Sequence, residues 1–458
     1  MTLDLPLNAL EIITSLQNAG FEAYAVGGSI RDLLIGKPTH GWDFTTNATP
    51  EEILKVFPDS FYDNQFGTVG IKIYANGHKI GIDEKPLDIY EVTTFRSEKE
   101  YTDYRHPDNL AWGTSLTEDL SRRDFTMNAI AYDGKTLTDP YGGQTAIQNK
   151  LIQTVGDANK RFLEDALRMM RAVRFAAQLG FTVEESTALA ISKNADLLTK
   201  ISSERIRDEF FKILTSEHAA DAILVLKNVG LLHHILPELE VSFATPQKSP
   251  KRHHLYDVGT HSIMALKYCP STDPLVRLAT LIHDLGKPKT YKVLDNGIVT
   301  FYNHEVVGAH LAKHISKRMR LSKKDEEKLI TLVRWHQFSV DERQTDSAIR
   351  RFIRRVGKEN LADILALRIG DRLGGGALET SWRLELYKKR IEEVQLQPFG
   401  VADLKIDGHD VMKIFDITPS RKIGEVLESV FADVEKNILA NDRDVLLAHL
   451  EKLHTEEK

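Results

Sequence analysis

The chain has 458 residues, and its formal net charge of −6 combines 60 Lys and Arg with 66 Asp and Glu. Hydrophobic residues make up 42% of the chain and charged residues 28%, which indicates a soluble protein of about three domains and excludes global disorder. The negative charge excludes a uniformly basic nucleic-acid-binding protein, and the single cysteine, Cys269, excludes a disulfide scaffold or a cysteine-based zinc cluster.

The N-terminal residues 1–21 lack the basic segment and the long apolar run of a signal peptide, so we expect a cytoplasmic protein. No stretch approaches the roughly 20 apolar residues of a membrane span, so we also expect no membrane partner.

Residues 23–36 are predicted to form a strand, a tight turn and a helix. Gly27 and Gly28 form the turn, which allows the backbone to approach a phosphate closely. Arg31 follows in the first helical turn, where a guanidinium can bind phosphate. An ordinary strand–helix turn explains the same pattern, so these residues alone do not define a site.

Asp43 lies in the next predicted strand, at residues 42–46. A carboxylate there could hold Mg²⁺, which prefers oxygen ligands, although a structural role explains one aspartate equally well.

An Asn-Gly pair at 76–77 predicts a hairpin, and the β-branched, aromatic run at 87–95 predicts a further strand.

Charged residues recur in the segment 119–133. Arg122 and Arg123 could bind a triphosphate, and Asp124 could lie near the ribose of a nucleotide. The structural alternative is a helix N-terminus with an acidic first turn.

A helical pattern follows at residues 161–179. Asp165 and Arg168 are three residues apart, so they are expected to neighbour each other on a helix, and Arg171 and Arg174 continue that row. The pair is either an exposed ion pair or a donor and acceptor set for the Watson–Crick edge of C or A.

Histidine and aspartate residues that could bind a metal occur in the later helical region. His261, the adjacent His283 and Asp284, and Asp371 follow the order H…HD…D, and such ligands suit a transition metal that activates water. Three further histidines lie between them, namely His304, His310 and His336. A lone histidine is usually a core residue, but the adjacent pair resembles the signature of HD phosphohydrolases. This resemblance implies a metal-dependent phosphohydrolase or a degenerate structural domain.

A cluster of arginines lies in the predicted helix at 347–358, at Arg350, Arg351, Arg354 and Arg355. Two i,i+4 pairs share one helix side, with no acidic residue among them. Such a cluster is often only a solvated surface, but its density favours contact with RNA phosphates.

Taken together, the motifs resemble the class II tRNA nucleotidyltransferase/poly(A) polymerase family, and especially bacterial CCA-adding enzymes with an HD domain. The similar segments are GGSIRD…WDFTT, SRRDFTMNAIA, DPYGG, EDALRMMRAVRF and SSERIRDEFFKIL. We therefore predict a polymerase-β-like α/β nucleotidyltransferase head at 1–150 and an all-α neck at 151–244 that selects nucleotides and binds RNA. A helical HD domain at 245–398 and a C-terminal helical tail at 399–458 complete the predicted chain.

The resemblance implies template-independent addition of C, C and A to tRNA 3′ ends, from CTP and ATP and with Mg²⁺ in the head. The residues that it implies to be catalytic are Asp43, Glu91 and Arg123. Those that it implies to bind the nucleotide are Gly27, Gly28, Arg31, Arg122, Arg123, Asp124, Asp165, Arg168, Arg171 and Arg174. Poly(A) polymerases share these motifs, but the long polar segment at 94–116 favours full CCA addition.

Position 41 departs from the family pattern. The family has an Asp-x-Asp pair in its first motif, whereas this chain has Gly41-Trp42-Asp43. Alternate residues of a strand share a face, so an aspartate at 41 would converge with Asp43 on the metal, and glycine supplies no ligand. We therefore expect impaired catalysis, by design or by natural divergence. Two alternatives stay open: an HD phosphohydrolase whose head only binds RNA, and an inactive tRNA-binding protein.

Overall fold

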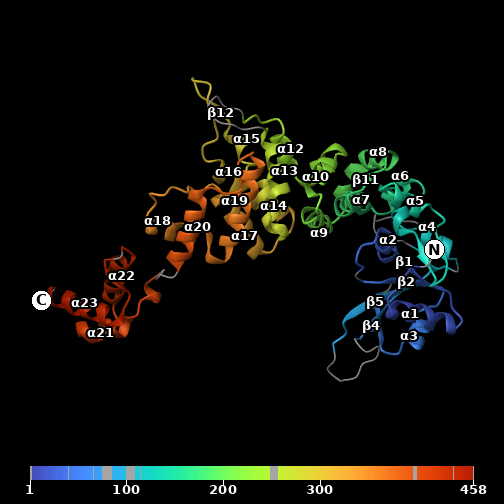
Figure 1. The fold of residues 1–458 in the computed structure, drawn as a ribbon, viewed down its shortest axis with the longest axis horizontal. Helices are drawn as coiled ribbons and strands as arrows, with labels where there is room; N and C mark the ends of the chain where they lie inside the picture. The colour runs from blue at the N-terminus through green and yellow to red at the C-terminus, as the bar shows by residue number, and fades with distance from the viewer. Residues whose placement is uncertain are drawn as a thin grey trace. The chain divides into compact units, whose positions relative to one another are not determined.

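The computed structural model describes residues 3–39, 41–64, 67–74, 85–99, 109–113, 115–247, 256–395, 400–436 and 438–456. The chain forms two compact units (Figure 1). The N-terminal unit comprises residues 1–244 with 315–321, and the C-terminal unit comprises residues 245–314 with 322–458.

A seven-stranded sheet with the order β3-β4-β5-β2-β1-β8-β9 lies at the centre of the head. Its strands are β1 (Ala23–Val26), β2 (Asp43–Thr46), β3 (Ser60–Asn64), β4 (Thr68–Ile73), β5 (Asp88–Thr94), β8 (Ala131–Tyr132) and β9 (Leu137–Thr138). β2 and β5 are parallel, and the other neighbouring strands are antiparallel. The mixed sheet and the helices after it confirm the predicted α/β head and helical region. The predicted turn at 76–77 lies outside the described residues.

The two faces of this sheet are covered by different helices. α1 (Leu7–Asn18) and α3 (Pro50–Val56) pack on one face, where Phe44 is buried. α4 (Leu116–Ser121) packs on the other face. Because side chains alternate along a strand, Asp43 of the same strand belongs to the face of α4.

The remaining elements of the head are short. They are α2 (Gly28–Ile35), β6 (Arg96–Lys99), β7 (Asn109–Trp112), η1 (Thr126–Asn128) and α5 (Gly143–Gln148). β6 and β7 form a separate antiparallel pair within the segment 94–116. Residues 100–108 and 114 of that segment lie outside the described residues.

Helices make up most of the rest of the N-terminal unit. They are α6 (Ala158–Glu164), α7 (Leu167–Leu179), α8 (Glu185–Asn194), η2 (Ala195–Lys200), α9 (Ser203–Leu214), α10 (Ala219–Asn228), α11 (Leu231–Ile235) and α12 (Pro237–Ser242). The short strands β10 (Leu151–Ile152) and β11 (Thr182–Val183) pair beside them in parallel. Gly180 ends α7 in a left-handed conformation with a φ of 69°, as its sequence position predicts.

The C-terminal unit is mainly helical. Its first helices are α13 (Val258–Tyr268), α14 (Pro274–Ile282), α15 (Lys287–Thr290), α16 (His304–Arg318, of which 304–314 belong here), α17 (Lys323–Trp335), α18 (Asp346–Val356), η3 (Lys358–Asn360), α19 (Leu361–Gly374) and α20 (Trp382–Gln395). A hairpin of β12 (Lys292–Val293) and β13 (Val299–Thr300) follows α15. α13 and α19 touch so closely that a Cβ at Gly374 would lie 2.4 Å from the Ala265 nitrogen.

The end of the C-terminal unit has a hydrophobic core of its own. It comprises η4 (Val401–Asp403), α21 (Gly408–Phe415), α22 (Arg421–Glu435) and α23 (Arg443–Glu456). Val411, Val430 and Leu446 are buried at its centre. Among the described helices of both units, none combines the length and the apolar character needed to cross a bilayer.

Candidate active site

A cavity of about 500 Å³ in the N-terminal unit gathers residues from the sheet and from the helices after it. It is lined by Gly27, Gly28, Arg31, Asp43, Arg122, Arg123, Asp124, Asn128, Asp165, Leu167, Arg168, Arg171, Arg174, Phe175 and Arg205. All ten residues that the sequence analysis selected for nucleotide binding are among them, whereas Glu91 is not. Seven arginines and only three aspartates line the cavity, so its charge suits a polyanion.

Gly27 allows two charged side chains to meet at the N-terminus of α2. It has a φ of 77°, a conformation that favours glycine. A Cβ at this position would lie 3.3 Å from both Asp43 Oδ2 and Arg123 Nη1. The free N–H groups and the positive dipole end of a helix favour an anion beside these side chains.

Arg31 is held in place by polar and aromatic contacts. It donates a hydrogen bond to Asn128 Oδ1 at 2.8 Å and pairs with Asp32 at 2.8 Å. Its guanidinium lies 5.1 Å from the centre of the Phe175 ring. Asn128 and Phe175 were not selected from the sequence, although both lie inside the segments that carry the family resemblance.

Asp124 is a buried carboxylate at the wall of the cavity. It pairs with Arg171 at 2.6 Å and accepts a hydrogen bond from Asn128 Nδ2 at 3.0 Å. Burial alone would raise the pKa of Asp124, but Arg171, Asn128 and Arg168 outweigh it and lower the pKa to about 2. The carboxylate is therefore charged at neutral pH.

Arg174 is a buried cation at the wall of the same cavity. It pairs with Glu209 at 2.9 Å, and its guanidinium lies 4.3 Å from the centre of the Phe175 ring. Burial and the nearby Arg171 lower the pKa of Arg174 to about 10, although the charge of Glu209 acts to raise it. Arg174 is thus a desolvated cation with a fixed position.

The predicted pairing of Asp165 with Arg168 on one helix is wrong. Asp165 has an extended backbone between α6 and α7, and it pairs with Arg205 of α9 at 3.0 Å. Arg168 pairs instead with Glu164 and donates a hydrogen bond to the Arg122 carbonyl oxygen at 3.0 Å. The break in the helix frees both side chains to line the cavity separately. Sequence reasoning missed Arg205, although it lies in the segment SSERIRDEFFKIL.

Asp43 and Glu91 are neighbours in the parallel register of β2 and β5, so they share one face of the sheet. Desolvation raises the pKa of Asp43 above its usual value, against the pull of Arg123 and Arg31. Two oxygen ligands side by side fit a hard divalent cation such as Mg²⁺.

Gly41 lies outside the strand, contrary to the expectation that it shares a face with Asp43. β2 begins only at Asp43, and Gly41 precedes it with a φ of 71°. No atom of the described residues beyond its chain neighbours lies within 4 Å of a Cβ built at Gly41. A side chain at this position would therefore have space but a strained backbone.

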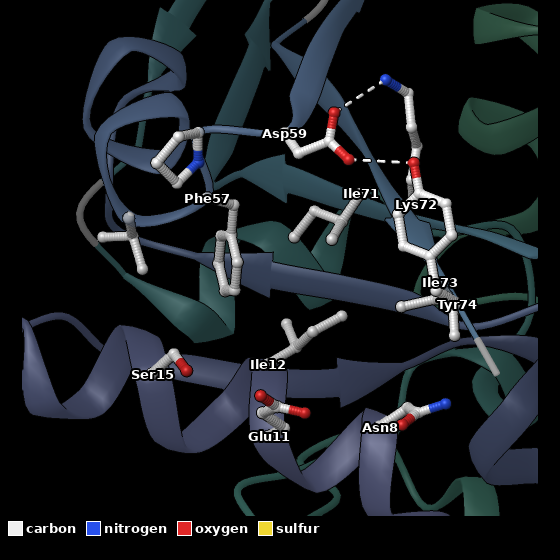
Figure 2. A pocket seen from close by; sticks show the side chains of 12 residues that line it. Asn8, Glu11, Ile12, Ser15, Phe57, Asp59, Ile71, Lys72, Ile73 and Tyr74 are labelled. Atoms are coloured by element: carbon white, nitrogen blue, oxygen red, sulfur yellow. Dashed lines mark hydrogen bonds and ion pairs between the residues drawn. The ribbon is translucent and has the colours of Figure 1, made fainter. Parts of the chain in front are cut away.

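A second cavity lies between α1 and β4, on the opposite face of the sheet from Asp43 (Figure 2). Ile12, Ile71 and other apolar side chains line much of it. Its Asp59 carboxylate pairs with Lys72 at 3.1 Å and accepts a hydrogen bond from the Tyr74 hydroxyl at 2.9 Å. Among the described residues, the one lysine that lines this cavity is thus already paired.

The C-terminal unit brings the predicted HD residues together. His261 Nε2 lies 3.2 Å from Asp371 Oδ1 and 3.3 Å from His283 Nε2. Asp284 Oδ2 lies 3.2 Å from His283 Nε2. These four side chains come from α13, the end of α14 and α19. His261, His283 and Asp371 form one group that could hold a metal ion, and His283, Asp284 and His336 form another.

Two histidines that the sequence analysis left unassigned extend this cluster. His304 Nε2 lies 3.3 Å from Asp284 Oδ1 and 3.3 Å from His336 Nε2. Asp284 therefore stands between two groups of ligands, one at each of its oxygens. His310, by contrast, is exposed on α16.

Backbone carbonyl groups orient these histidines for a metal. The Nδ1 atoms of His283, His304 and His336 lie 2.7, 2.9 and 2.7 Å from the carbonyl oxygens of Thr280, Phe301 and Val333. Since a carbonyl oxygen only accepts, each Nδ1 carries a proton, and a metal would be bound by the Nε2 atoms. The residues present thus fit a transition-metal centre.

The arginines of α18 do not all reach the surface. Arg350 is 1% exposed and donates a hydrogen bond to the Glu435 carbonyl oxygen at 2.6 Å, so the expectation that it contacts RNA is wrong. Arg354 is exposed but pairs with Glu435 at 2.9 Å. Arg351 and Arg355 are exposed, and Arg355 stacks 5.0 Å from the Trp335 ring centre.

Three segments of the chain match known protein families. Residues 23–153 match the family described as "Poly A polymerase head domain". Residues 180–243 match "Probable RNA and SrmB- binding site of polymerase A", and residues 253–373 match "HD domain". The class of the protein is therefore a nucleotidyltransferase that carries an HD domain.

Whole-chain relatives narrow this class further. The chain is 32% identical to the CCA-adding enzyme of Leuconostoc mesenteroides over 446 residues, which are 96% of this chain and 94% of that relative. The crystal structure of the Bacillus stearothermophilus CCA-adding enzyme in complex with CTP is similar, with a TM-score of 0.71, 28% identity and 99% coverage of both chains. The chain belongs to the family of CCA-adding enzymes.

A shorter match has a higher identity. The chain is 49% identical to the CCA-adding enzyme of Geobacillus sp. (strain WCH70) over 229 residues, 50% of this chain and 54% of that relative. At this higher identity the chain thus spans about half the length of the relative.

Proposed function

We propose that this protein adds C, C and A to the 3′ ends of tRNA, using CTP and ATP. The observation that supports this most directly is the cavity in which the two-glycine turn, Asp43, seven arginines and Asp165 come together. A similar solved enzyme has CTP bound. A tRNA substrate would place the protein in the cytoplasm.

In the proposed reaction, the tRNA 3′-hydroxyl attacks the α-phosphorus of the bound nucleotide. The new phosphodiester bond forms as the bond to the bridging oxygen breaks, the hydroxyl proton is lost and pyrophosphate leaves. Arg31, Arg122 and Arg123 hold the triphosphate in line for this displacement. Asp43 and Glu91 would hold Mg²⁺, whose charge stabilises the attacking and leaving oxygens.

The choice of base is assigned to Asp165 and Arg168. C and A both carry an exocyclic amine next to a ring nitrogen on the Watson–Crick edge. Asp165 can accept from the amine, and Arg168 can donate to the ring nitrogen. A poly(A) polymerase is the alternative in the same class, and it would use ATP alone.

We further propose that Gly41 lowers the turnover of this chain. Where the family pattern has a carboxylate, glycine offers no ligand, and Glu91 is the remaining described carboxylate that the strand register places beside Asp43. An inactive tRNA-binding protein is the limiting case of this proposal.

The test is incorporation of labelled CMP and AMP into tRNA that lacks its last three nucleotides. We expect both nucleotides to be added, and Asp43→Ala to abolish addition while CTP still binds. Asp59→Ala is the matched control, because Asp59 lies on the other face of the head sheet. Incorporation that is unchanged in Asp43→Ala would contradict the proposal.

A second function is favoured by the histidine–aspartate cluster of the C-terminal unit. We propose that it binds transition-metal ions and hydrolyses phosphoesters by activating water. Asp284, with one ligand group at each of its oxygens, would be shared by two ions.

Metal analysis of the purified protein tests this second proposal. We expect about two equivalents of a transition metal per chain, and hydrolysis of a phosphodiester substrate without added nucleoside triphosphate. Asp284→Ala should remove both, whereas His310→Ala should change neither. A metal-free protein that hydrolyses nothing would show that the domain is structural.

A further inference from the structure

Asp119 is a buried carboxylate directly behind the cavity, and it has no part in the reaction proposed above. Its side chain is 0% exposed. Its Oδ1 accepts from Arg122 Nε at 2.9 Å, Arg122 Nη2 at 2.7 Å and the Arg96 backbone nitrogen at 3.4 Å. Its Oδ2 accepts from Thr45 Oγ1 at 3.1 Å and Arg123 Nη2 at 3.3 Å.

These five donors come from three parts of the head. Arg122 and Arg123 follow α4, Thr45 lies on β2 two residues from Asp43, and Arg96 begins β6. One carboxylate thus joins the two arginines to the strand that bears Asp43. The Arg96 amide ties the same carboxylate to the start of the segment 94–116.

The charge on Asp119 is compensated well enough to persist in the interior. Burial alone would raise the pKa of Asp119, but Arg122 and Arg123 lower it below the usual value. A buried charge is tolerated only when it is paired and hydrogen-bonded, as it is here. The arginine side chains are only 15% and 18% exposed, so the pairing also restricts their orientation.

Without such a partner, the arginines of the cavity would repel each other. Arg122 and Arg123 share the cavity with five other arginines. A guanidinium free to rotate would turn toward solvent, and the cost of fixing it would then fall on nucleotide binding. Because Asp119 already fixes both arginines in the free enzyme, nucleotide binding does not carry this free-energy cost.

We propose that Asp119 is a positioning residue for the triphosphate. It holds Arg122 and Arg123 in their binding orientation relative to Asp43 and to the root of the segment 94–116. This inference rests on the proposed function, in which the cavity binds CTP and ATP.

Equilibrium binding of CTP and ATP in the presence of Mg²⁺ tests the proposal without requiring turnover. Isothermal titration of the full chain should show that Asp119→Asn weakens both nucleotides about tenfold or more. Thr45→Val removes only one donor to Oδ2, so a weakening of about two- to fivefold is expected. Thr45→Val also keeps the proposal testable if Asp119→Asn does not fold.

A mutant cycle separates positioning from a general loss of stability. Because Asp119 acts through Arg122, Asp119→Asn should weaken CTP binding little further in an Arg122→Gln background. Asp139→Asn is the control, since Asp139 accepts hydrogen bonds from the Gly143 and Gln144 nitrogens outside the cavity. This variant should lower the melting temperature without changing CTP affinity. The inference would be overturned if the effects of Asp119→Asn and Arg122→Gln on CTP binding were fully additive. It would also be overturned if Asp119→Asn alone bound CTP within twofold of the unmutated chain. An unmutated chain that binds no CTP would instead overturn the proposed function.

Discussion

At the level of single residues, the candidate site holds several of its arginines in ion pairs with carboxylates. Arg171 pairs with Asp124, Arg174 with Glu209 and Arg205 with Asp165. Each pair fixes a long side chain that would otherwise lose conformational entropy on binding. The two-glycine turn and the arginines were predicted from the sequence because their spacing is local. The pairings were not predicted, because they join segments that are distant in the chain; Asp124 and Asp165 were predicted as site residues, whereas Arg205 was missed.

A carboxylate at position 41 should raise nucleotide incorporation by roughly 10- to 100-fold, because a third charged ligand beside Asp43 and Glu91 would strengthen metal binding. Gly41→Asn is the matched control. Asparagine tolerates the left-handed backbone about as well as aspartate but brings no charge. Incorporation rates that are equal in Gly41→Asp, Gly41→Asn and the unmutated chain would contradict the role given to this position.

Asp124 should contribute to stability in a way that depends on pH. Its pKa of about 2 is below the usual value of 3.8, so the charged form stabilises the fold by about 2 kcal/mol at neutral pH. This stabilisation is fully present above the ordinary pKa and is lost as pH falls from about 4 toward 2. In urea unfolding, Asp124→Asn should therefore lose more stability at pH 7 than at pH 3. An equal loss at both pH values would contradict this account.

At the scale of elements, the sequence predicted regular segments better than their interruptions. Residues 161–179 show one helical pattern, yet the structure breaks it at Asp165. Hydrophobic periodicity could not reveal this break, at which the Asp165 carboxylate accepts from the Leu167 backbone nitrogen at 3.0 Å and pairs with the distant Arg205. Likewise, the i,i+4 spacing in α18 did not show that Arg350 faces the interior.

The junction of α6 and α7 should control the choice of base. Arg205→Gln removes the ion-pair partner of Asp165, so discrimination of CTP and ATP against UTP and GTP should fall about tenfold. Arg207→Gln is the control, because Arg207 lies on the same helix and pairs with Asp208 but does not line the cavity. Single-nucleotide incorporation with each triphosphate measures the effect, and unchanged discrimination in Arg205→Gln would argue against this role.

The exposed face of α18 should contribute to tRNA binding. Replacing Arg351 and Arg355 by glutamate should weaken binding and lower the slope of log affinity against log salt by about 1 per lost phosphate contact. Arg343→Glu is the control, since Arg343 is exposed in the same unit but pairs with Asp341. Filter binding over a range of salt concentrations measures the slope. An unchanged slope in the double variant would exclude this surface.

At the scale of the whole molecule, two units carry two different kinds of site. The N-terminal unit concentrates arginines around a cavity, while the C-terminal unit concentrates histidines around Asp284. The net charge of −6 is a sum over the whole chain, and it reveals neither the arginine cluster nor the histidine cluster. It excluded a uniformly basic binder correctly, but local clusters of charge, not the total, decide what each unit can bind.

Stepwise addition to three tRNA substrates is the direct test of CCA addition by this protein. The substrates end before the first C, after the first C and after the second C, and each is incubated with CTP, ATP or both, using the unmutated chain and Gly41→Asp. We expect CMP to be added to the first two substrates and AMP only to the third, and we expect addition to stop after CCA. A run of A residues from ATP alone, or no addition by either chain, would contradict this expectation.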